Sequence, residues 1–269
     1  MKRNSILSVV LLNAAFFASC APSIPFEEKV ATQVAISFTA TALDELLHKA
    51  TDTPVPLVQD TLTPTATEPL PEGDPRNSLG APTWSDNLST GKNWNLESSE
   101  ITFGNTTFSA QDGQLVATSS TTSEGYVWWL NFRRLKNAYL EAKFNVGECS
   151  GSDQYGLVFR AVNYDDGYAY YYSVTCSGNY NIRRITSSGS VLLLDTPESN
   201  FINSGSNQTN TLGIWMQDNR ISLYVNGQFL QEFTDNELNN EGHFGLFINA
   251  VQTPGFTIKM DEISYWLLD

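Results

Sequence analysis

The sequence is poor in the side chains that most often act in catalysis or bind metals. Among 269 residues there are two histidines and three cysteines, and charged residues make up only 16%. His48 lies near the N-terminus, and His243 stands at the expected start of a strand. A Ser-His-Asp triad or a histidine-rich zinc site would therefore depend on His243 alone. CxxC spacing and the phosphate-binding patterns GxxxxGK[ST] and GxGxxG are also absent.

Basic residues are the second shortage. The chain has 15 Lys and Arg against 29 Asp and Glu, which gives a formal net charge of −14. The imbalance continues after residue 80, where 10 basic residues face 20 acidic ones. Nucleic acids bind through basic groups that neutralise phosphates, so this surface would repel them. Anionic lipids are disfavoured for the same reason, and a neutral ligand is the natural expectation.

The sequence also has no apolar run near the roughly 20 residues that a membrane-spanning helix needs. It begins MKRNSILSVVLLNAAFFASC, with a basic start and a short apolar stretch, which is typical of a secretory signal. The last four of these residues resemble the lipobox of bacterial lipoproteins, although Phe17 replaces the preferred leucine. The resemblance implies an exported protein that is cleaved before Cys20 and anchored there by lipid, outside the cytoplasm. The alternative is an ordinary signal peptide that is cut nearby.

Residues 21–80 have the character of a tether. Residues 26–50 contain helix formers with loosely spaced apolar positions, which predicts a marginal helix. Residues 51–75 contain six prolines and six threonines, so we expect residues 51–80 to form an extended, disordered spacer. With a lipid at Cys20, this region would act as a stalk.

Residues 81–269 are long enough for one sizeable core. Short alternating or apolar runs are separated by Gly, Asn, Asp and Ser clusters, and no helical period of ten residues occurs. This texture predicts an all-β, two-sheet antiparallel sandwich of the jelly-roll type. The expected strands are 126–132, 138–146, 155–162, 168–176, 180–186, 191–195, 211–217, 221–225, 228–233, 244–250 and 257–266.

Two cysteines remain after the signal. Cys149 follows one expected strand and Cys176 another, and these ends lie on the same side of a three-stranded meander. A disulfide between them is predicted, since disulfides persist in exported proteins. Two buried free thiols are the alternative.

Alternation along the strands suggests a ligand surface. Side chains of a strand point to opposite faces in turn, so Tyr170 and Tyr172 should enter the core and Tyr171 should point outward. The same argument places Arg160 and Arg183 beside Tyr171, and it exposes Trp129 while burying its neighbours Trp128, Leu130 and Phe132. Aromatic rings stack on pyranose faces and guanidinium groups donate to hydroxyls, so these four residues are the predicted carbohydrate site. A plain cross-strand packing cluster is the alternative.

An ordered set of short phrases carries a family resemblance. It includes WSDNL at Trp84, LEAKF at Leu140, YGLVFR at Tyr155, ISLYVNG at Ile221, GHFGL at Gly242 and DEI at Asp261. In this order they resemble the concanavalin A-like lectin and glucanase jelly rolls, in particular the laminin-G-like and 3-keto-disaccharide-hydrolase-like branches. The resemblance implies a fold that often receives sugars, and in some members cleaves them. It also allows a structural calcium at Asp86 and Asp261, for which turn-capping acids are the alternative.

Catalytic carboxyls are harder to find. In the related glucanases a single strand carries E-x-D-x-E, which places its acids on one face. No strand here has that pattern; Glu141 shares a face with Lys143, and the adjacent Asp261 and Glu262 should point in opposite directions. Pairs that form between different strands remain open. The leading hypothesis is therefore a surface-tethered, lectin-like module without catalysis. The alternatives are a glycoside hydrolase or 3-keto-disaccharide-hydrolase-like enzyme, and a protein-interaction module of the cell envelope.

Overall fold

The computed structural model describes residues 69–97 and 100–269, without the side chains of residues 195–197. The signal sequence, Cys20, the expected helix and most of the expected spacer lie outside the described residues. Within these ranges no helix is long and apolar enough to cross a membrane.

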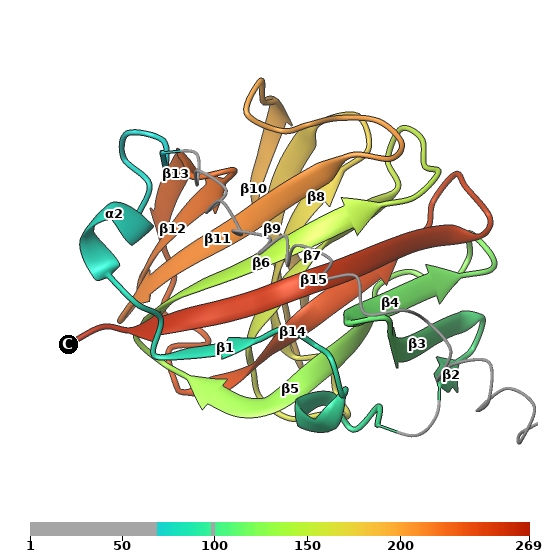
Figure 1. The fold of residues 1–269 in the computed structure, drawn as a ribbon, viewed down its shortest axis with the longest axis horizontal. Coiled ribbons are helices and arrows are strands. Elements are labelled where there is room, and N and C mark those ends of the chain that lie inside the picture. Colours follow the sequence, from blue (N-terminus) through green and yellow to red (C-terminus); the bar gives the residue numbers. More distant parts are fainter. Residues whose placement is uncertain (1–68, 98–99) are drawn as a thin grey trace, which may run out of the picture. The chain divides into compact units, whose positions relative to one another are not determined.

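Two antiparallel sheets form a sandwich, as predicted (Figure 1). The larger sheet has nine strands in the order β13-β12-β11-β6-β15-β4-β3-β2, and β1 pairs with β15. Its strands are β1 (Trp84–Asp86), β2 (Ile101–Phe103), β3 (Thr106–Gln111), β4 (Gln114–Ser119), β6 (Ala138–Val146), β11 (Thr209–Gln217), β12 (Arg220–Val225), β13 (Gln228–Thr234) and β15 (Phe256–Leu267).

The smaller sheet has six strands in the order β10-β9-β8-β7-β14-β5. These are β5 (Val127–Leu135), β7 (Gln154–Ala161), β8 (Ala169–Thr175), β9 (Asn179–Thr186), β10 (Gly189–Glu198) and β14 (Gly242–Asn249). The helical elements of the described residues are short: α2 (Arg76–Leu79) and the 3-10 turn η1 (Lys92–Trp94).

Four strands, β1 to β4, precede the first strand that the sequence predicts. They are only three to six residues long, and their Ser and Gln side chains interrupt the longer apolar runs on which the prediction relied. The hairpin of β3 and β4 depends instead on its turn, where Asp112 and Gly113 both take the left-handed backbone conformation.

The core lies between the sheets, and the tyrosines of β8 supply part of it. Tyr170 and Tyr172 are fully buried in it, as predicted. A turn over residues 163–168 that pairs Val162 with Ala169 would place Phe159 opposite Tyr172. This expected register was wrong by two residues, because Phe159 lies opposite Tyr170. A shift of two residues keeps every side chain on its face, so the assignment of these two tyrosines to the core survived the error.

A disulfide joins Cys149 and Cys176, as predicted, with 6.1 Å between the two Cα atoms. Cys149 follows β6 of the larger sheet and Cys176 follows β8 of the smaller one, so the bond links the two layers. The expected three-stranded meander was therefore wrong, because β6 does not pair with β7. At the same end, the buried carboxylate of Asp153 accepts backbone N–H groups of Ser150, Val251, Gln252 and Thr253.

Residues 69–80 lie against the larger sheet, although their composition predicts that they belong to the disordered spacer. Asp74 is 2% exposed and fits over Gly227, where any Cβ atom would collide with its carboxylate. Arg76 at the start of α2 forms ion pairs with Asp74 and with Glu141 of β6. These polar contacts depend on tertiary partners, which a proline-rich composition does not reveal.

Candidate functional site

The predicted carbohydrate surface fails at its central residue. Tyr171 points to the outer face of the smaller sheet, as alternation requires, but none of its surface is exposed. Tyr126, Trp128 and Phe247 pack around its ring, and its hydroxyl donates to the Gly167 carbonyl at 2.8 Å. The prediction that Tyr171 is exposed is therefore wrong, because a second aromatic layer covers this part of the outer face.

Arg160 is also buried, with 2% of its surface exposed. Its backbone takes a positive φ of 51° at a bulge beside Gly242, which turns the side chain away from the expected surface. The guanidinium donates to the carbonyl oxygens of Lys136, Asp218 and Leu238 and to the Asn239 side chain. Arg160 joins loops at the end of the sandwich, and the prediction of an exposed Arg160 is wrong.

The faces of β5 are the reverse of those predicted. Trp129 packs toward the main core, stacks on Phe108 at 5.6 Å and donates its indole N–H to the Trp94 carbonyl at 2.6 Å. Trp128 and Leu130 point to the opposite face, and Phe132 is 53% exposed. The predicted exposure of Trp129 and burial of Phe132 are both wrong, because β5 is an edge strand with no apolar pattern that fixes its faces.

Arg183 does lie on the outer face of the smaller sheet. Its guanidinium stands 5.8 Å from the centre of the Tyr126 ring and donates to Ser190 Oγ at 2.9 Å. The four predicted ligand residues thus do not form one surface: Arg160 and Tyr171 are interior, while Trp129 and Arg183 occupy different faces of the sheet.

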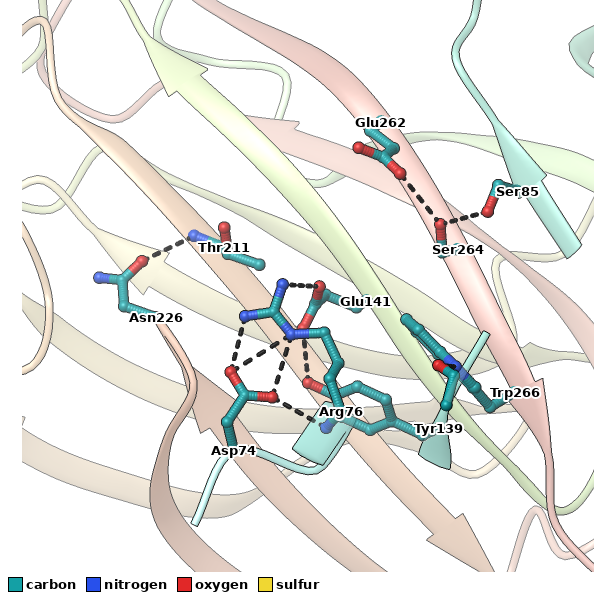
Figure 2. Close-up of polar contacts among 11 residues, drawn as sticks. Asp74, Arg76, Ser85, Tyr139, Glu141, Thr211, Asn226, Glu262, Ser264 and Trp266 are labelled. Carbon is teal, nitrogen blue, oxygen red and sulfur yellow. Dashed lines mark hydrogen bonds and ion pairs between the residues drawn. The ribbon is translucent and has the colours of Figure 1, made fainter. Parts of the chain in front are cut away.

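A polar pocket of about 210 Å³ lies on the outer face of the larger sheet. Figure 2 shows part of its lining, which comes from α2 (Arg76), β6 (Glu141), β11 (Thr211) and β15 (Glu262, Ser264 and Trp266). The lining residues are Arg76, Pro82, Glu141, Ala142, Lys143, Thr211, Glu262, Ser264 and Trp266.

Glu141 is the buried carboxyl of this pocket. Its side chain is 10% exposed; one oxygen accepts the Tyr139 hydroxyl at 2.7 Å and the other pairs with Arg76 Nη1 at 3.1 Å (Figure 2). Burial raises the pKa of Glu141, and the nearby carboxylates of Asp74 and Glu262 add to this effect. Arg76 and the Tyr139 hydroxyl act in the opposite direction without reversing it.

Glu262 is the exposed carboxyl, and a bulge brings it to this face. The register of β15 against β6 shifts between Met260 and Glu262, after which Glu262 lies opposite Lys143 and Ser264 opposite Glu141. Glu262 and Glu141 are therefore diagonal neighbours on one face. Asp261 bonds Asn145 and lies 3.7 Å from Lys143 Nζ, so it also reaches this side. The prediction that Asp261 and Glu262 point in opposite directions fails because it assumed a regular strand.

Aromatic packing around Tyr139 holds the pocket residues in place. The ring of Tyr139 lies over Gly213, where a Cβ atom would overlap the Tyr139 hydroxyl. Tyr139 also packs against Trp215 and Trp266 of the neighbouring strands, with ring centres 6.2 and 5.4 Å apart. The aromatic cluster thus fixes the residue that holds Glu141 in place.

The two candidate calcium ligands have separate protein partners. Asp86 accepts hydrogen bonds from Leu88 N, Asn93 and the Trp94 indole. Asp261 accepts from Gln114 and Asn145, each at 2.6 Å. In the described ranges no group of three or more His, Cys, Asp or Glu side chains could hold a metal ion. The calcium site stays a prediction.

One part of the pocket was visible in the sequence. Glu262, Ser264 and Trp266 alternate along one run, which indicates a shared face, and Glu141 with Lys143 was assigned to one face correctly. Arg76 carried no signal, because its contribution depends on how residues 69–80 fold back onto the sheet.

The comparisons with known proteins identify the family. Residues 82–256, more than half of the chain, match the model of the 3-keto-alpha-glucoside-1,2-lyase-like domain. The chain belongs to this family. The comparison with curated proteins gives no match.

Solved structures with similar folds are distant in sequence. A galectin-like protein of unknown function from Bacillus subtilis is 13% identical, with 70% of this chain and 97% of that one covered and a TM-score of 0.51. The carbohydrate-binding module CBM66 from B. subtilis is 15% identical, over 56% and 86%, with a TM-score of 0.46. The catalytic domain of an endo-1,3-beta-glucanase from Thermotoga petrophila is 13% identical, over 70% and 98%, also at 0.46. Such similarity concerns the fold and leaves the activity open.

Proposed function

We propose that this protein cleaves a glycoside by acid–base chemistry in the polar pocket, with a 3-keto-α-glucoside as substrate. One observation carries the proposal: the buried Glu141 and the exposed Glu262 are diagonal neighbours in one pocket. Two carboxyls in different environments suit the two proton transfers of such a reaction, because burial raises the pKa of Glu141 and so favours its protonated form. The family supplies the substrate class.

The chemistry assigns a role to each carboxyl. In a 3-keto-α-glucoside the C3 carbonyl acidifies the proton on C2. Glu262 would remove this proton, the C2–H electrons would form a C1–C2 double bond, and the bond from C1 to the glycosidic oxygen would break. Glu141 would give its proton to the departing oxygen, which leaves as an alcohol. The raised pKa of Glu141 favours this role.

Two cations complete the assignment. Charge develops on the C3 oxygen when C2 loses its proton, and a fixed positive group stabilises such an oxyanion. Lys143 lies opposite Glu262 in the sheet, and Arg76 lies against Glu141. Both cations line the pocket that contains the two carboxyls. Trp266 is only 6% exposed, so it frames the pocket through its packing on Tyr139.

Turnover of a 3-keto-α-glucoside by the full chain tests the proposal. Release of the alcohol and formation of the unsaturated ketone would be followed together. We expect Glu262→Gln and Glu141→Gln each to lower kcat by at least ~100-fold, the usual contribution of a general acid or base. Glu241→Gln is the matched control, since Glu241 is an exposed acid paired with Arg134 beside the other sheet. The absence of product from the unmodified protein would refute the proposal.

Carbohydrate binding without catalysis is the second candidate. The observation that favours it is the Arg76–Glu141 ion pair, which stabilises the ionised carboxylate that cannot donate a proton. In that case the full chain would bind the sugar without forming product. Glu262→Gln would then weaken binding only severalfold. The pH dependence of binding would show no proton-transfer step.

The proposal includes a location. The signal-like N-terminus and Cys20 support an exported protein that a lipid holds at the membrane, with the domain outside the cytoplasm. Labelling with a palmitate analogue in a bacterial host tests this. Incorporation that is lost in Cys20→Ala would support the anchor, and equal labelling of both proteins would contradict it.

A further inference from the structure

A second and larger cavity lies at the open edge of the sandwich. It has a volume of about 590 Å³ and lies between the edge strand β5, η1 and the turn that joins β2 to β3. This volume is within the range of about 300–1,000 Å³ that is typical of small-molecule sites. Its aromatic lining residues are Trp94, Phe103, Tyr126, Trp128, Trp129, Phe132 and Tyr164.

Several of these rings are exposed rather than packed into the core. Phe103 and Phe132 are each 53% exposed, and Tyr164 is 46% exposed. Phe103 lies 5.8 Å from the Trp129 ring, and Phe132 lies 6.4 Å from Tyr164. Grouped exposed aromatic rings leave apolar surface in water, and such a group commonly marks a binding site.

The rings stand on a fixed support. Trp129 is held by its stack on Phe108 and its bond to the Trp94 carbonyl. The Tyr164 hydroxyl contacts His243 Nδ1 at 3.1 Å. Rings that are already oriented lose little conformational freedom when a flat ligand stacks on them.

Acidic groups stand among the rings. Glu124 bonds the Asn105 amide at 2.5 Å and lies over Gly104, where a Cβ atom would overlap its carboxylate. Asp165 lines the cavity as well. Carboxylates accept hydrogen bonds from sugar hydroxyls, and they repel fatty acids, phosphates and uronic acids. The net charge of −14 disfavours the same anions.

We propose that this cavity is a second carbohydrate site, which binds a neutral pyranose oligosaccharide by stacking on the exposed rings and hydrogen bonding to the acids. This ligand carries both apolar ring faces and hydroxyls, and the cavity offers both aromatic rings and carboxylates. The site is independent of the polar pocket: it is built from β5 and the β2–β3 turn, whereas the pocket is built from α2, β6, β11 and β15. It would hold a glycan chain without cleaving it.

Calorimetry with the full chain tests the proposal. The probes are neutral glucan oligosaccharides of three to six units, a uronic acid oligosaccharide, choline and a short extended peptide. We expect millimolar or tighter binding of a neutral oligosaccharide, with at least a fivefold loss in Phe103→Ala and in Phe132→Ala. Phe229→Ala is the matched control, because Phe229 is 51% exposed on β13 and does not line the cavity. This control should bind as the unmodified protein does.

Two further outcomes separate this site from the proposed catalytic pocket. Glu141→Gln and Glu262→Gln should leave the affinity for the neutral oligosaccharide unchanged, even where they abolish turnover. Loss of binding in these variants with retention in Phe103→Ala and Phe132→Ala would place the sugar in the polar pocket and overturn the proposal. Binding of choline, the peptide or the uronic acid alone, or of no probe, would overturn it as well.

Discussion

The outer faces of the two sheets are covered by different kinds of residue. On the smaller sheet, Tyr171, Val158 and Phe247 form a satellite core with no exposed surface beneath partly buried aromatics. On the larger sheet, Glu262 and Lys143 are exposed, and an ion network of Asp74, Arg76 and Glu141 lies beside them. One outer face therefore stabilises the fold, whereas the other leaves charged groups within reach of a ligand.

This difference shows what strand alternation can establish. Alternation states on which side of a sheet a residue lies, but it does not state what covers that side. Tyr171 was assigned to the correct face and nevertheless is buried, because Tyr126 and Trp128 pack over it. An outward residue of a two-layer protein is exposed only where no loop or edge strand folds over the sheet.

The largest effect is expected from Tyr171→Ala. A fully buried aromatic side chain that is cut back to alanine leaves a cavity, which typically lowers the free energy of unfolding by about 3–5 kcal/mol. Lys143→Ala, on the outer face of the other sheet, should change it by less than about 0.5 kcal/mol. Urea denaturation measures both. Equal effects of the two substitutions would remove the contrast between the two faces.

Removal of the disulfide is expected to have the next largest effect on the free energy of unfolding. The bond joins strands of the two sheets across 27 residues, and its loss should lower the free energy of unfolding by about 3–4 kcal/mol in the chain-entropy model. Cys149→Ala/Cys176→Ala and the reduced protein should agree in urea denaturation. A change below about 1 kcal/mol would show that other contacts already hold the layers together.

The sequence allowed the architecture to be predicted from alternation and turn signals that repeat along the chain, and the cysteine pairing because only two cysteines follow the signal-like segment. The strand β6 and the facing of Tyr170 and Tyr172 depend on strict alternation between flanking turns. The site was less predictable because it depends on irregularities. The bulge at Asp261 and the folding back of Arg76 are set by contacts between distant segments, which no local pattern encodes.

Asp153→Asn tests the end of the sandwich where both sheets meet. Burial alone would raise the pKa of Asp153, but hydrogen bonds from the Thr253 side chain and from the Gln252, Ser150 and Val251 backbone hold the pKa below the usual value. A lowered pKa means that the stabilisation is present above the ordinary aspartate pKa and is lost as the pH falls through the value in the folded protein. Asparagine should cost about 1–3 kcal/mol at pH 7, because the NH2 group that replaces Oδ2 cannot accept the Ser150 N–H.

The pH dependence separates this effect from simple loss of packing. The stability of the unmodified protein should fall below a pH of about 4, near the ordinary pKa of aspartate. In Asp153→Asn this acid-dependent fall should be smaller, which denaturation at a series of pH values would show. If the stability of both proteins falls by the same amount toward acid pH, the ionisation of Asp153 contributes nothing to stability.

The smallest effect concerns Arg76, which distinguishes the charged face from an ordinary surface. Arg76→Gln removes the ion pairs with Asp74 and Glu141 and should lower the free energy of unfolding by about 1 kcal/mol, because the side chain is still 28% exposed. Arg220→Gln is the matched control, since the Arg220–Glu232 pair is 3.8 Å apart and both side chains are about half exposed. This control should change the stability by a few tenths of a kcal/mol.

The sign of the pH dependence makes the Arg76 test specific. Arg76 lowers the pKa of Glu141 against the raising effect of burial, so its removal should raise that pKa further. A group with a raised pKa in the folded state favours folding at low pH and loses that contribution as the pH rises through this value. The deficit of Arg76→Gln should thus grow as the pH rises through the pKa of Glu141, where the carboxyl loses its proton without a cationic partner, and should shrink toward acid pH. Because Arg220 pairs with an exposed acid, its variant should show no such trend. A pH-independent deficit in Arg76→Gln would mean that Arg76 only anchors residues 69–80 and leaves the proton affinity of Glu141 unaltered.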